Sequence, residues 1–440
     1  MHLRIIKVFV LSLAVLLLTC LFAQAKEITG EVEITGLNSS LICDANLYTH
    51  DVGENFTLTF NSPVSMQGVY IEFNSAPKGA KINNKDIFEN GYLHEYLSLD
   101  GVTQASIYFD SADICNVYVY DNEPLPENVQ QWQEPTESGV DLLLLATHSD
   151  DDQLFFAGLL PLYASRENTS VAVAYFANHY DTYNRTHELL NGLWHCGVRV
   201  YPEISPFPDG YSESAKEAAA FLETRGFDKE SVNAFHALLL EKYKPQIVVL
   251  HDFNGEYGHG AHMHATESFT DFIASYNGYL PKKVYVHLYK ENPIVIDIDT
   301  PSDTFGGKSA FNVSQEAFKY HKSQHWTWFY DWIYGKNNDI TSSSQINKYN
   351  PAQYGLYYTL VGADTQNDMF ENIITYEEER LMLEKEHLLK EDEKEQVIIT
   401  QEDKNIVNEK EKTNVLPSLT ISFVFVLLIV LIIFTKGRKK

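Results

Sequence analysis

Two clusters of histidine and aspartate in this sequence have side chains suited to hydrolytic chemistry. The first is Thr147-His148-Ser149-Asp150-Asp151-Asp152, directly after a run of apolar residues. Burying so many polar side chains unpaired would be costly, so ordinary packing does not explain them. Imidazole nitrogen and carboxylate oxygen are good ligands for zinc, which in catalytic sites takes three protein ligands and leaves a position open for water. Taken alone, an acidic helix N-terminus beside a structural histidine would also explain the segment.

The second cluster runs from His251 to His264 and follows another apolar run. Its glycines let the backbone turn sharply, and His259 and His262 stand where they could share one face of an opening helix. His264, two residues after His262, should point away from that face. Together the two clusters favour a site for one metal ion over a purely structural role.

The elements that must position these clusters alternate between strand and helix. Continuous apolar runs predict strands buried on both faces at 141–146, 171–176, 246–250 and 284–288. Helical patterns lie between them at 153–166, 185–196 and 230–243. This alternation predicts an α/β fold with a doubly wound, mostly parallel sheet. Such sheets bind ligands beyond the carboxyl ends of their strands, which is where both clusters stand.

The two clusters resemble the PIG-L / LmbE-like family of zinc-dependent N-acetylglucosamine deacetylases. The shared pattern is His-x-Asp-Asp-(Asp/Glu) after a first strand, followed later by Tyr-Gly-His-x-x-His. The resemblance covers about residues 140–375 and extends to three further segments: Arg185-Thr186-His187-Glu188, Phe207-Pro208-Asp209-Gly210 and 319–324. It implies an LmbE-like sheet domain over this range.

The resemblance also implies a ligand set and a base. His148, Asp151 and His262 would bind Zn²⁺, and Asp150 would act as the general base on the water that zinc activates. A site of two histidines and one aspartate could also accept Fe²⁺ or another divalent ion.

Four further residues match positions of the family outside the ligand set. Tyr257 and His259 match those that stabilise the oxyanion and protonate the leaving amine. Arg185 and Asp209 would bind substrate, although Arg185 could instead pair with Glu188 on its own helix. By contrast, the aromatic run from Trp326 to Trp332 is better interpreted as core packing than as a platform for sugars.

The function implied is that of a metal-dependent amidase, which removes the acetyl group from an N-acetylglucosamine-type sugar. Ala261 replaces a common Asp or Asn beside the third ligand. Because the loss of such a partner weakens a metal site, a catalytically impaired glycan-binding surface protein is the main alternative. A metallophosphatase is a further alternative, but such enzymes usually need two metals and more ligands than this sequence offers.

Residues 26–125 have the alternating pattern of short strands separated by turn-forming residues. They predict a small all-β, sandwich-like domain, which could bind carbohydrate or serve as a spacer. Cys43 and Cys115 both fall in it, and an oxidising exterior would permit them to pair. A polar linker at 126–139 leads to the sheet domain.

Both ends of the chain have targeting patterns. A basic start, an apolar run and a small-residue cleavage pattern predict a signal peptide at 1–25. A charged stalk at 376–415 would lead to a transmembrane helix at 416–435 and a basic cytoplasmic tail at 436–440. We therefore expect a single-pass cell-membrane protein whose extracellular catalytic domain acts on a surface glycan or glycolipid.

The overall charge argues against one class of partner. Lys and Arg total 33 against 60 Asp and Glu, giving a formal net charge of −27. Such a surface repels phosphate backbones, so no nucleic-acid partner is expected.

Overall fold

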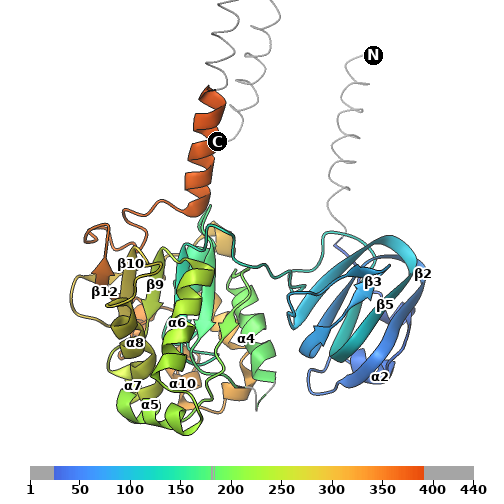
Figure 1. Ribbon diagram of the computed structural model, residues 1–440, viewed down its shortest axis with the longest axis horizontal. Helices are drawn as coiled ribbons and strands as arrows, with labels where there is room; N and C mark the ends of the chain where they lie inside the picture. Colours follow the sequence, from blue (N-terminus) through green and yellow to red (C-terminus); the bar gives the residue numbers. More distant parts are fainter. Residues whose placement is uncertain (1–23, 180–181, 183, 391–440) are drawn as a thin grey trace, which may run out of the picture. The chain divides into compact units, whose positions relative to one another are not determined.

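The computed structural model describes residues 24–179, 182 and 184–390. Two β-sheets organise this part of the chain, one of five strands and one of seven (Figure 1). The five-stranded sheet ends at Tyr120 and the seven-stranded sheet begins at Leu142. The predicted boundaries at 26–125, 126–139 and 140–375 stay predictions.

The five-stranded sheet has the order β1-β2-β5-β3-β4. Its strands are β1 (Glu33–Thr35), β2 (Asp51–Lys78), β3 (Lys81–Ile82), β4 (Lys85–Asp86) and β5 (His94–Tyr120). The sequence predicts several short strands here, but β2 and β5 are long and irregular in register. Val69 pairs with Val119 on one side and with Leu97 on the other, so β2 is flanked twice by β5. The sheet thereby covers its own core, in which Phe60, Phe73 and Phe109 are fully buried.

The cysteines of the described residues are all free, including Cys43, which is exposed, and Cys115, which is buried. The pairing that the sequence permits is therefore not formed. A short helix, α2 (Ser39–Ile42), precedes Cys43 directly.

The seven-stranded sheet is mixed, with the order β11-β12-β10-β9-β6-β7-β8. Its strands are β6 (Leu142–Ala146), β7 (Val171–Tyr175), β8 (Glu203–Ile204), β9 (Ile247–Leu250), β10 (Lys283–His287), β11 (Pro293–Val295) and β12 (Gln353–Thr359). The strands from β10 to β8 run parallel, while β12 and β11 are antiparallel at one edge. The central strands are buried along their whole length because helices cover both faces.

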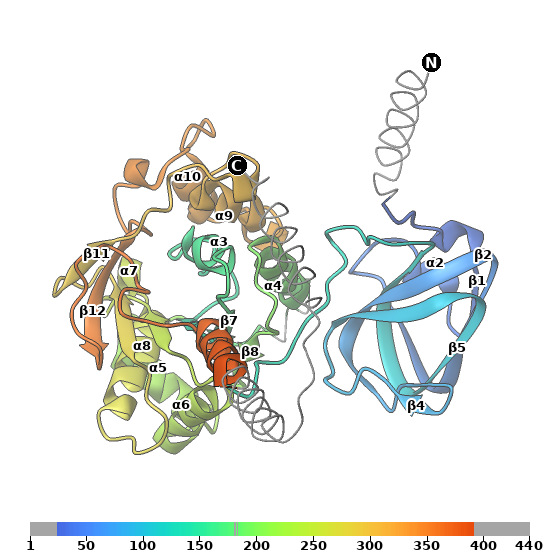
Figure 2. The ribbon, with the colours of Figure 1, turned by 90° about the horizontal axis from the view of Figure 1, so that it is seen from above.

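Two helical layers enclose the sheet (Figure 2). One face packs on α3 (Leu159–Ala164), α4 (Asn184–His195), α9 (Ala310–Phe318) and α10 (Trp328–Tyr334). The other packs on α5 (Ala215–Thr224), α6 (Lys229–Tyr243) and α8 (Gly260–Ile273). Alternate residues of β6 point into these two cores: Leu144 into the first, Leu143 and Leu145 into the second.

One predicted helix is shorter than its pattern. The sequence predicts a helix over 153–166, but α3 begins at Leu159. Gly158 has a φ of 85°, which interrupts a right-handed helix, and its amide donates to Ser314 Oγ over 2.7 Å. The residues before it are turns that keep the first histidine–aspartate cluster outside any helix.

The predicted membrane anchor is corrected. Among the described residues, no helix is both long and apolar enough to span a membrane. The helical residues 376–390 are rich in Glu, Lys and Arg, whose charges prefer water. The predicted transmembrane helix at 416–435 lies outside the described residues, as do the tail at 436–440 and residues 1–23 of the predicted signal peptide. The fold class is therefore corrected to a mixed α/β protein with two sheets, and the single-pass membrane localisation is withdrawn.

Candidate metal centre

The two histidine–aspartate clusters meet at the carboxyl ends of neighbouring strands. β6 pairs in parallel with β7 on one side and with β9 on the other, so the chain changes direction across the sheet at this point. Thr147 follows β6 and His251 follows β9. A doubly wound sheet binds its ligands at such a crossing point.

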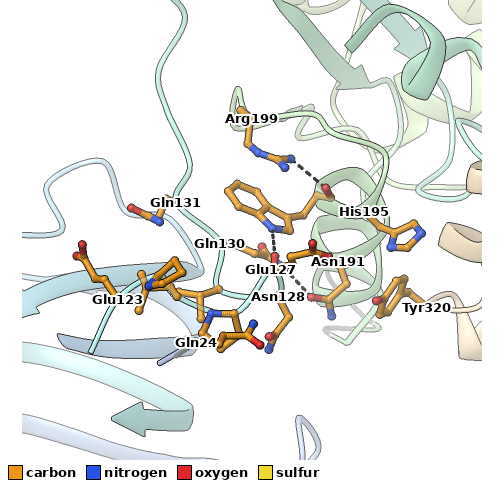
Figure 3. A pocket seen from close by; sticks show the side chains of 15 residues that line it. Gln24, Glu123, Glu127, Asn128, Gln130, Gln131, Asn191, His195, Arg199 and Tyr320 are labelled. Atoms are coloured by element: carbon orange, nitrogen blue, oxygen red, sulfur yellow. Dashed lines mark hydrogen bonds between the residues drawn. The ribbon is translucent and has the colours of Figure 1, made fainter. Parts of the chain in front are cut away.

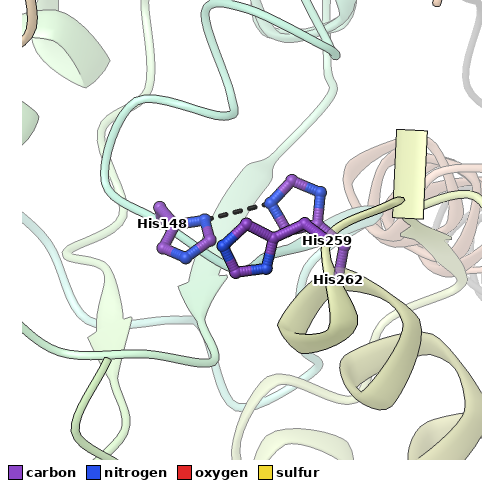
Figure 4. A group of neighbouring side chains, drawn as sticks. All are labelled: His148, His259 and His262. Carbon is purple, nitrogen blue, oxygen red and sulfur yellow. Dashed lines mark hydrogen bonds between the residues drawn. The ribbon is translucent and has the colours of Figure 1, made fainter. Parts of the chain in front are cut away.

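The start of α8 brings the second cluster to the first. His259 caps this helix and accepts a hydrogen bond at Nδ1 from the amide of Ala261 over 3.2 Å. His262 therefore lies in the first turn, on the side that faces His148. Figure 4 shows the imidazoles of His148, His259 and His262 converging from the loop after β6 and from α8.

Three side-chain atoms form a small triangle at the centre of the site. His148 Nδ1 lies 3.0 Å from His262 Nε2 and 3.1 Å from Asp151 Oδ2. His262 Nε2 lies 3.4 Å from the same Asp151 oxygen. All three residues are buried. The fold thus brings together the three residues that are predicted from the sequence as one ligand set.

The outer nitrogens of both histidines face carboxylates. His148 Nε2 lies 3.2 Å from Asp209 Oδ1, and His262 Nδ1 lies 2.6 Å from Glu256 Oε2. A carboxylate accepts a hydrogen bond, so the nitrogen that faces it carries the hydrogen. The other nitrogen of each ring, inside the triangle, then presents its lone pair. The same carboxylate–histidine arrangement orients histidine ligands in metal sites.

The triangle therefore consists of acceptors that need a cation between them. Ligand bonds of 2.0–2.2 Å in tetrahedral geometry place neighbouring ligand atoms about 3.3 Å apart, close to the separations among His148, Asp151 and His262. Although burial opposes the charged form, Asp209 and Asp151 raise the pKa of His148 well above its ordinary value, so the site favours positive charge at this point. The residues present fit a divalent ion such as zinc.

Among the described residues, two overlapping groups could hold a metal ion: His148 with His259 and His262, and Asp151 with His251 and His262. Each group includes one histidine that is not in the predicted ligand set, His259 in the first and His251 in the second. Their hydrogen bonds argue against both as ligands. His251 Nε2 accepts from the amide of Thr147 over 3.0 Å, so its lone pair is already used. In His259 the accepting Nδ1 leaves the hydrogen on Nε2, which makes that atom a donor rather than a ligand.

Glu256 is a central residue of the site that sequence reasoning did not identify. Its side chain is fully buried and its carboxylate faces Nδ1 of three imidazoles, those of His251, His262 and His287, at 3.1, 2.6 and 3.0 Å. The backbone at Glu256 has a φ of 51°, an unfavourable value for a residue with a side chain. A glutamate inside a run of four histidines was the available signal, but its partners come from three separate segments.

Asp150, the predicted base, lies in the same loop and is buried. Burial raises its pKa to about 6, although the Arg185 guanidinium opposes this shift. Arg185 Nη2 donates to Asp150 Oδ1 over 3.2 Å. Arg185 does not pair with Glu188 in this structure, because Glu188 accepts two hydrogen bonds from the amide and hydroxyl of Ser323.

The other predicted residues surround the triangle. Tyr257 packs edge-on against His259 and His262, with ring centroids 5.5 and 5.6 Å apart. Asp209, predicted to bind substrate, faces His148 and so helps to orient a predicted ligand. Ala261, which replaces the common Asp or Asn, is buried, and its amide donates to Nδ1 of His259. Asp209 and Glu256 thus provide the carboxylates that Ala261 does not.

A large cavity lies elsewhere in the chain. It has a volume of about 1180 Å³ and is lined by the connector residues 123–131 and by one side of α4 (Figure 3). The Arg199 guanidinium covers the ring of Trp194 at 3.8 Å, and Trp194 Nε1 donates to the carbonyl of Glu127. No residue of the histidine triangle lines it. Its size therefore gives no support to a catalytic role.

Comparisons with known proteins give low similarity. No family model matches the chain, and no curated protein matches it. Among solved structures, a 4-carboxy-2-hydroxymuconate hydratase from Pseudomonas putida is 16% identical, covering 51% of this chain and 99% of its own, with a TM-score of 0.31. An N,N'-diacetylchitobiose deacetylase from Pyrococcus horikoshii is 14% identical, covering 56% of this chain and 91% of its own, with a TM-score of 0.34.

A conserved protein from Thermus thermophilus is 12% identical, covering 52% of this chain and 100% of its own, with a TM-score of 0.31. The structural neighbours thus include a deacetylase of the kind that the resemblance implies, without support from a family model. At TM-scores below 0.5 these likenesses carry no argument about the site. Its function is therefore inferred from its own residues.

Proposed function

We propose that this protein is a metal-dependent hydrolase that removes the acetyl group from an N-acetylglucosamine-type sugar, releasing acetate and a free amine. The observation that carries the proposal is the triangle of His148 Nδ1, His262 Nε2 and Asp151 Oδ2, with sides of 3.0 to 3.4 Å. A divalent ion among three buried acceptors at this spacing would offset the cost of burying them together. The predicted surface location is withdrawn, so the proposal names the sugar class and not where the sugar lies.

His148, Asp151 and His262 would hold the ion, with zinc expected and Fe²⁺ possible. When bound, the ion would polarise the amide carbonyl and lower the pKa of water at the site. Asp209 and Glu256 fix the two imidazoles so that their inner nitrogens face the triangle. This support keeps the ligands in place before the substrate arrives.

Asp150 is the residue that accepts a proton. Its carboxylate takes the proton from the attacking water, whose oxygen forms a bond to the amide carbon. Arg185 holds one carboxylate oxygen and leaves the second for this transfer. As the carbon–nitrogen bond breaks, Asp150 returns the proton to the leaving nitrogen, a step that the resemblance instead assigns to Tyr257 and His259. The net reaction adds one water, and acetate and amine leave.

Tyr257 and His259 would stabilise the oxyanion that forms on the carbonyl oxygen. His259 has its hydrogen on Nε2 because Nδ1 accepts from Ala261. Tyr257, two residues before His259, would contribute its hydroxyl group. Loss of one such donor typically costs about 100- to 1000-fold in rate.

A metallophosphatase is a poorer explanation of the same site. Its usual pair of metals would require two ligand sets. The two candidate groups among the described residues share His262, and His251 already accepts a backbone hydrogen bond. The geometry therefore supports one ion.

The proposal is tested by acetate release from N-acetylglucosamine and its β-1,4-linked tetramer. Asp150→Asn should abolish release because the amide cannot accept the proton, while the bound metal stays near the wild-type amount. Asp271→Asn, at an exposed aspartate of α8, is the matched control and should keep full activity. Undiminished release by Asp150→Asn, or no release by the wild type with metal bound, would refute the proposed reaction.

A further inference from the structure

Two aromatic side chains at the edge of the metal centre are exposed to solvent. Tyr211, in the loop after Asp209, has 73% of its surface exposed, and Trp328, at the start of α10, has 49% exposed. Trp326, two residues before Trp328, is 83% exposed. The sequence predicts core packing for this aromatic run, and the structure corrects that expectation for Trp326 and Trp328. Core packing therefore does not account for these two tryptophan side chains, and their position beside the metal centre is what bears on function.

The exposed rings are joined across the site by two rings of the proposed machinery. Tyr211 contacts His259 with centroids 5.4 Å apart, and His259 contacts Tyr257 at 5.5 Å. Tyr257 in turn contacts Trp328 at 5.7 Å. One exposed ring therefore borders each side of the Tyr257–His259 pair.

The Trp328 side is held firmly. Trp328 packs on Phe329 with centroids 4.3 Å apart, and Phe329 packs edge-on against the buried ring of Phe155. The preceding 3-10 turn (Lys322–Gln324) is tied to α4 through the hydrogen bonds of Ser323 to Glu188. A ring held in this way presents its face without a further loss of side-chain freedom on binding.

The loop that carries Tyr211 is held in place through the following residue, Ser212. The amide of Gly260 donates to the carbonyl of Ser212 over 2.8 Å, which ties the loop to the start of α8. A Cβ at Gly260 would lie 2.4 Å from the carbonyl oxygen of Ser214, so only glycine allows this approach. Tyr211 is consequently kept next to His259.

We propose that Tyr211 and Trp328 are stacking sites for the sugar rings on either side of the residue that is deacetylated. Pyranose rings present faces of C–H groups that pack on aromatic rings, while their hydroxyl groups stay in water. The preferred substrate is then an N-acetylated oligosaccharide or polysaccharide, and a monosaccharide, which reaches neither ring, is the poorer one. The inference rests on the proposed function, whose substrate class it narrows.

The test compares the β-1,4-linked tetramer of N-acetylglucosamine with the monosaccharide. Trp328→Ala and Tyr211→Ala should each raise KM for the tetramer by roughly 3- to 10-fold, the loss expected for one aromatic contact. The kcat/KM for the monosaccharide should stay within about twofold, because it needs neither ring. Trp328→Tyr should restore most of the tetramer KM. Tyr357→Ala, at an exposed ring on β12, is the control and should change neither substrate.

The two possible failures are distinguishable. Equal losses on both substrates would overturn the inference, since the rings would then support the centre itself, and so would unchanged KM values. If the wild type releases no acetate, the proposed reaction fails, and calorimetric binding of the tetramer decides on the rings. Absence of tetramer binding, or equal affinity in the wild type and Trp328→Ala, would then overturn the stacking sites.

Discussion

Nδ1 of His262 lies 2.6 Å from Oε2 of Glu256, inside a fully buried carboxylate–histidine contact. This contact sets the tautomer of His262 and turns its Nε2 toward His148. The same carboxylate faces His251 and His287, so one acidic side chain orients imidazoles from three segments. The metal centre thus depends on a residue that is not itself among the proposed ligands.

Glu256→Gln should weaken metal binding without changing the ligand atoms. The amide can present its NH₂ group to His262, which would favour the wrong tautomer. Losses of such orienting partners typically cost about 10- to 100-fold in metal affinity. Titration with a competing chelator measures this, with Glu267→Gln on the outer side of α8 as the control. An unchanged zinc affinity would show that Glu256 does not orient the ligand.

His259→Ala should separate metal binding from catalysis. Since His259 is assigned as a donor and not as a ligand, the purified variant should retain nearly the wild-type amount of metal. Acetate release should fall by about 100-fold or more because an oxyanion donor is lost. The variant also loses a helix cap, worth about 1 kcal/mol, which thermal unfolding should detect. Loss of the metal itself would return His259 to the ligand set.

Glu72 in the five-stranded sheet should make stability depend on pH. Burial raises its pKa to about 7 from 4.5, although Asn116 donates to its carboxylate over 2.8 Å and opposes the shift. A raised pKa in the folded state means that the neutral form is favoured, so the stability it contributes is complete below pH 4.5 and is lost as pH rises through 7. The loss is at most about 3 kcal/mol.

Glu72→Gln removes this titration. Its melting temperature should exceed that of the wild type at pH 8, and the difference should vanish toward pH 4.5. Thermal unfolding of both proteins across this range is the measurement. Parallel melting curves at every pH would exclude an unfavourable buried charge at Glu72.

Gly158→Ala should destabilise the sheet domain by about 1–3 kcal/mol. Gly158 has a φ of 85°, and an added Cβ would lie 2.6 Å from Cβ of Ile298. Both features oppose a side chain. Gly226→Ala is a matched control, since Gly226 has a φ of 91° with nothing within 4 Å. Chemical denaturation should show the larger loss for Gly158→Ala, and equal losses would mean that packing against Ile298 is relaxed.

The sequence was informative where local pattern decides structure. The apolar run before His148 is a strand because both of its faces are buried, and that burial is visible as an uninterrupted run. The placement of both clusters at the carboxyl ends of strands followed from the same alternation of strands and helices. The proximity of His148 and His262, although they are 114 residues apart, therefore needed only the order of the elements.

Tertiary contacts decided what the sequence left open. In its local sequence Glu256 is one acidic residue among histidines, and its role depends on imidazoles from the loop after β9, from α8 and from β10. Arg185 had a plausible local partner in Glu188, but Ser323 satisfies Glu188 and Asp150 receives the guanidinium. Trp326 and Trp328 belong to an aromatic run whose composition is typical of a core. Only the fold shows that these two side chains are exposed.

The central claim is that one cation joins His148, Asp151 and His262. Elemental analysis of the purified protein, measured beside His148→Ala, His262→Ala and His251→Ala, tests it most directly. The account predicts close to one divalent ion per wild-type chain, near-complete loss in His148→Ala and His262→Ala, and retention in a folded His251→Ala. A full complement of metal in folded His148→Ala, or a wild-type protein that binds none when zinc is supplied, would contradict it.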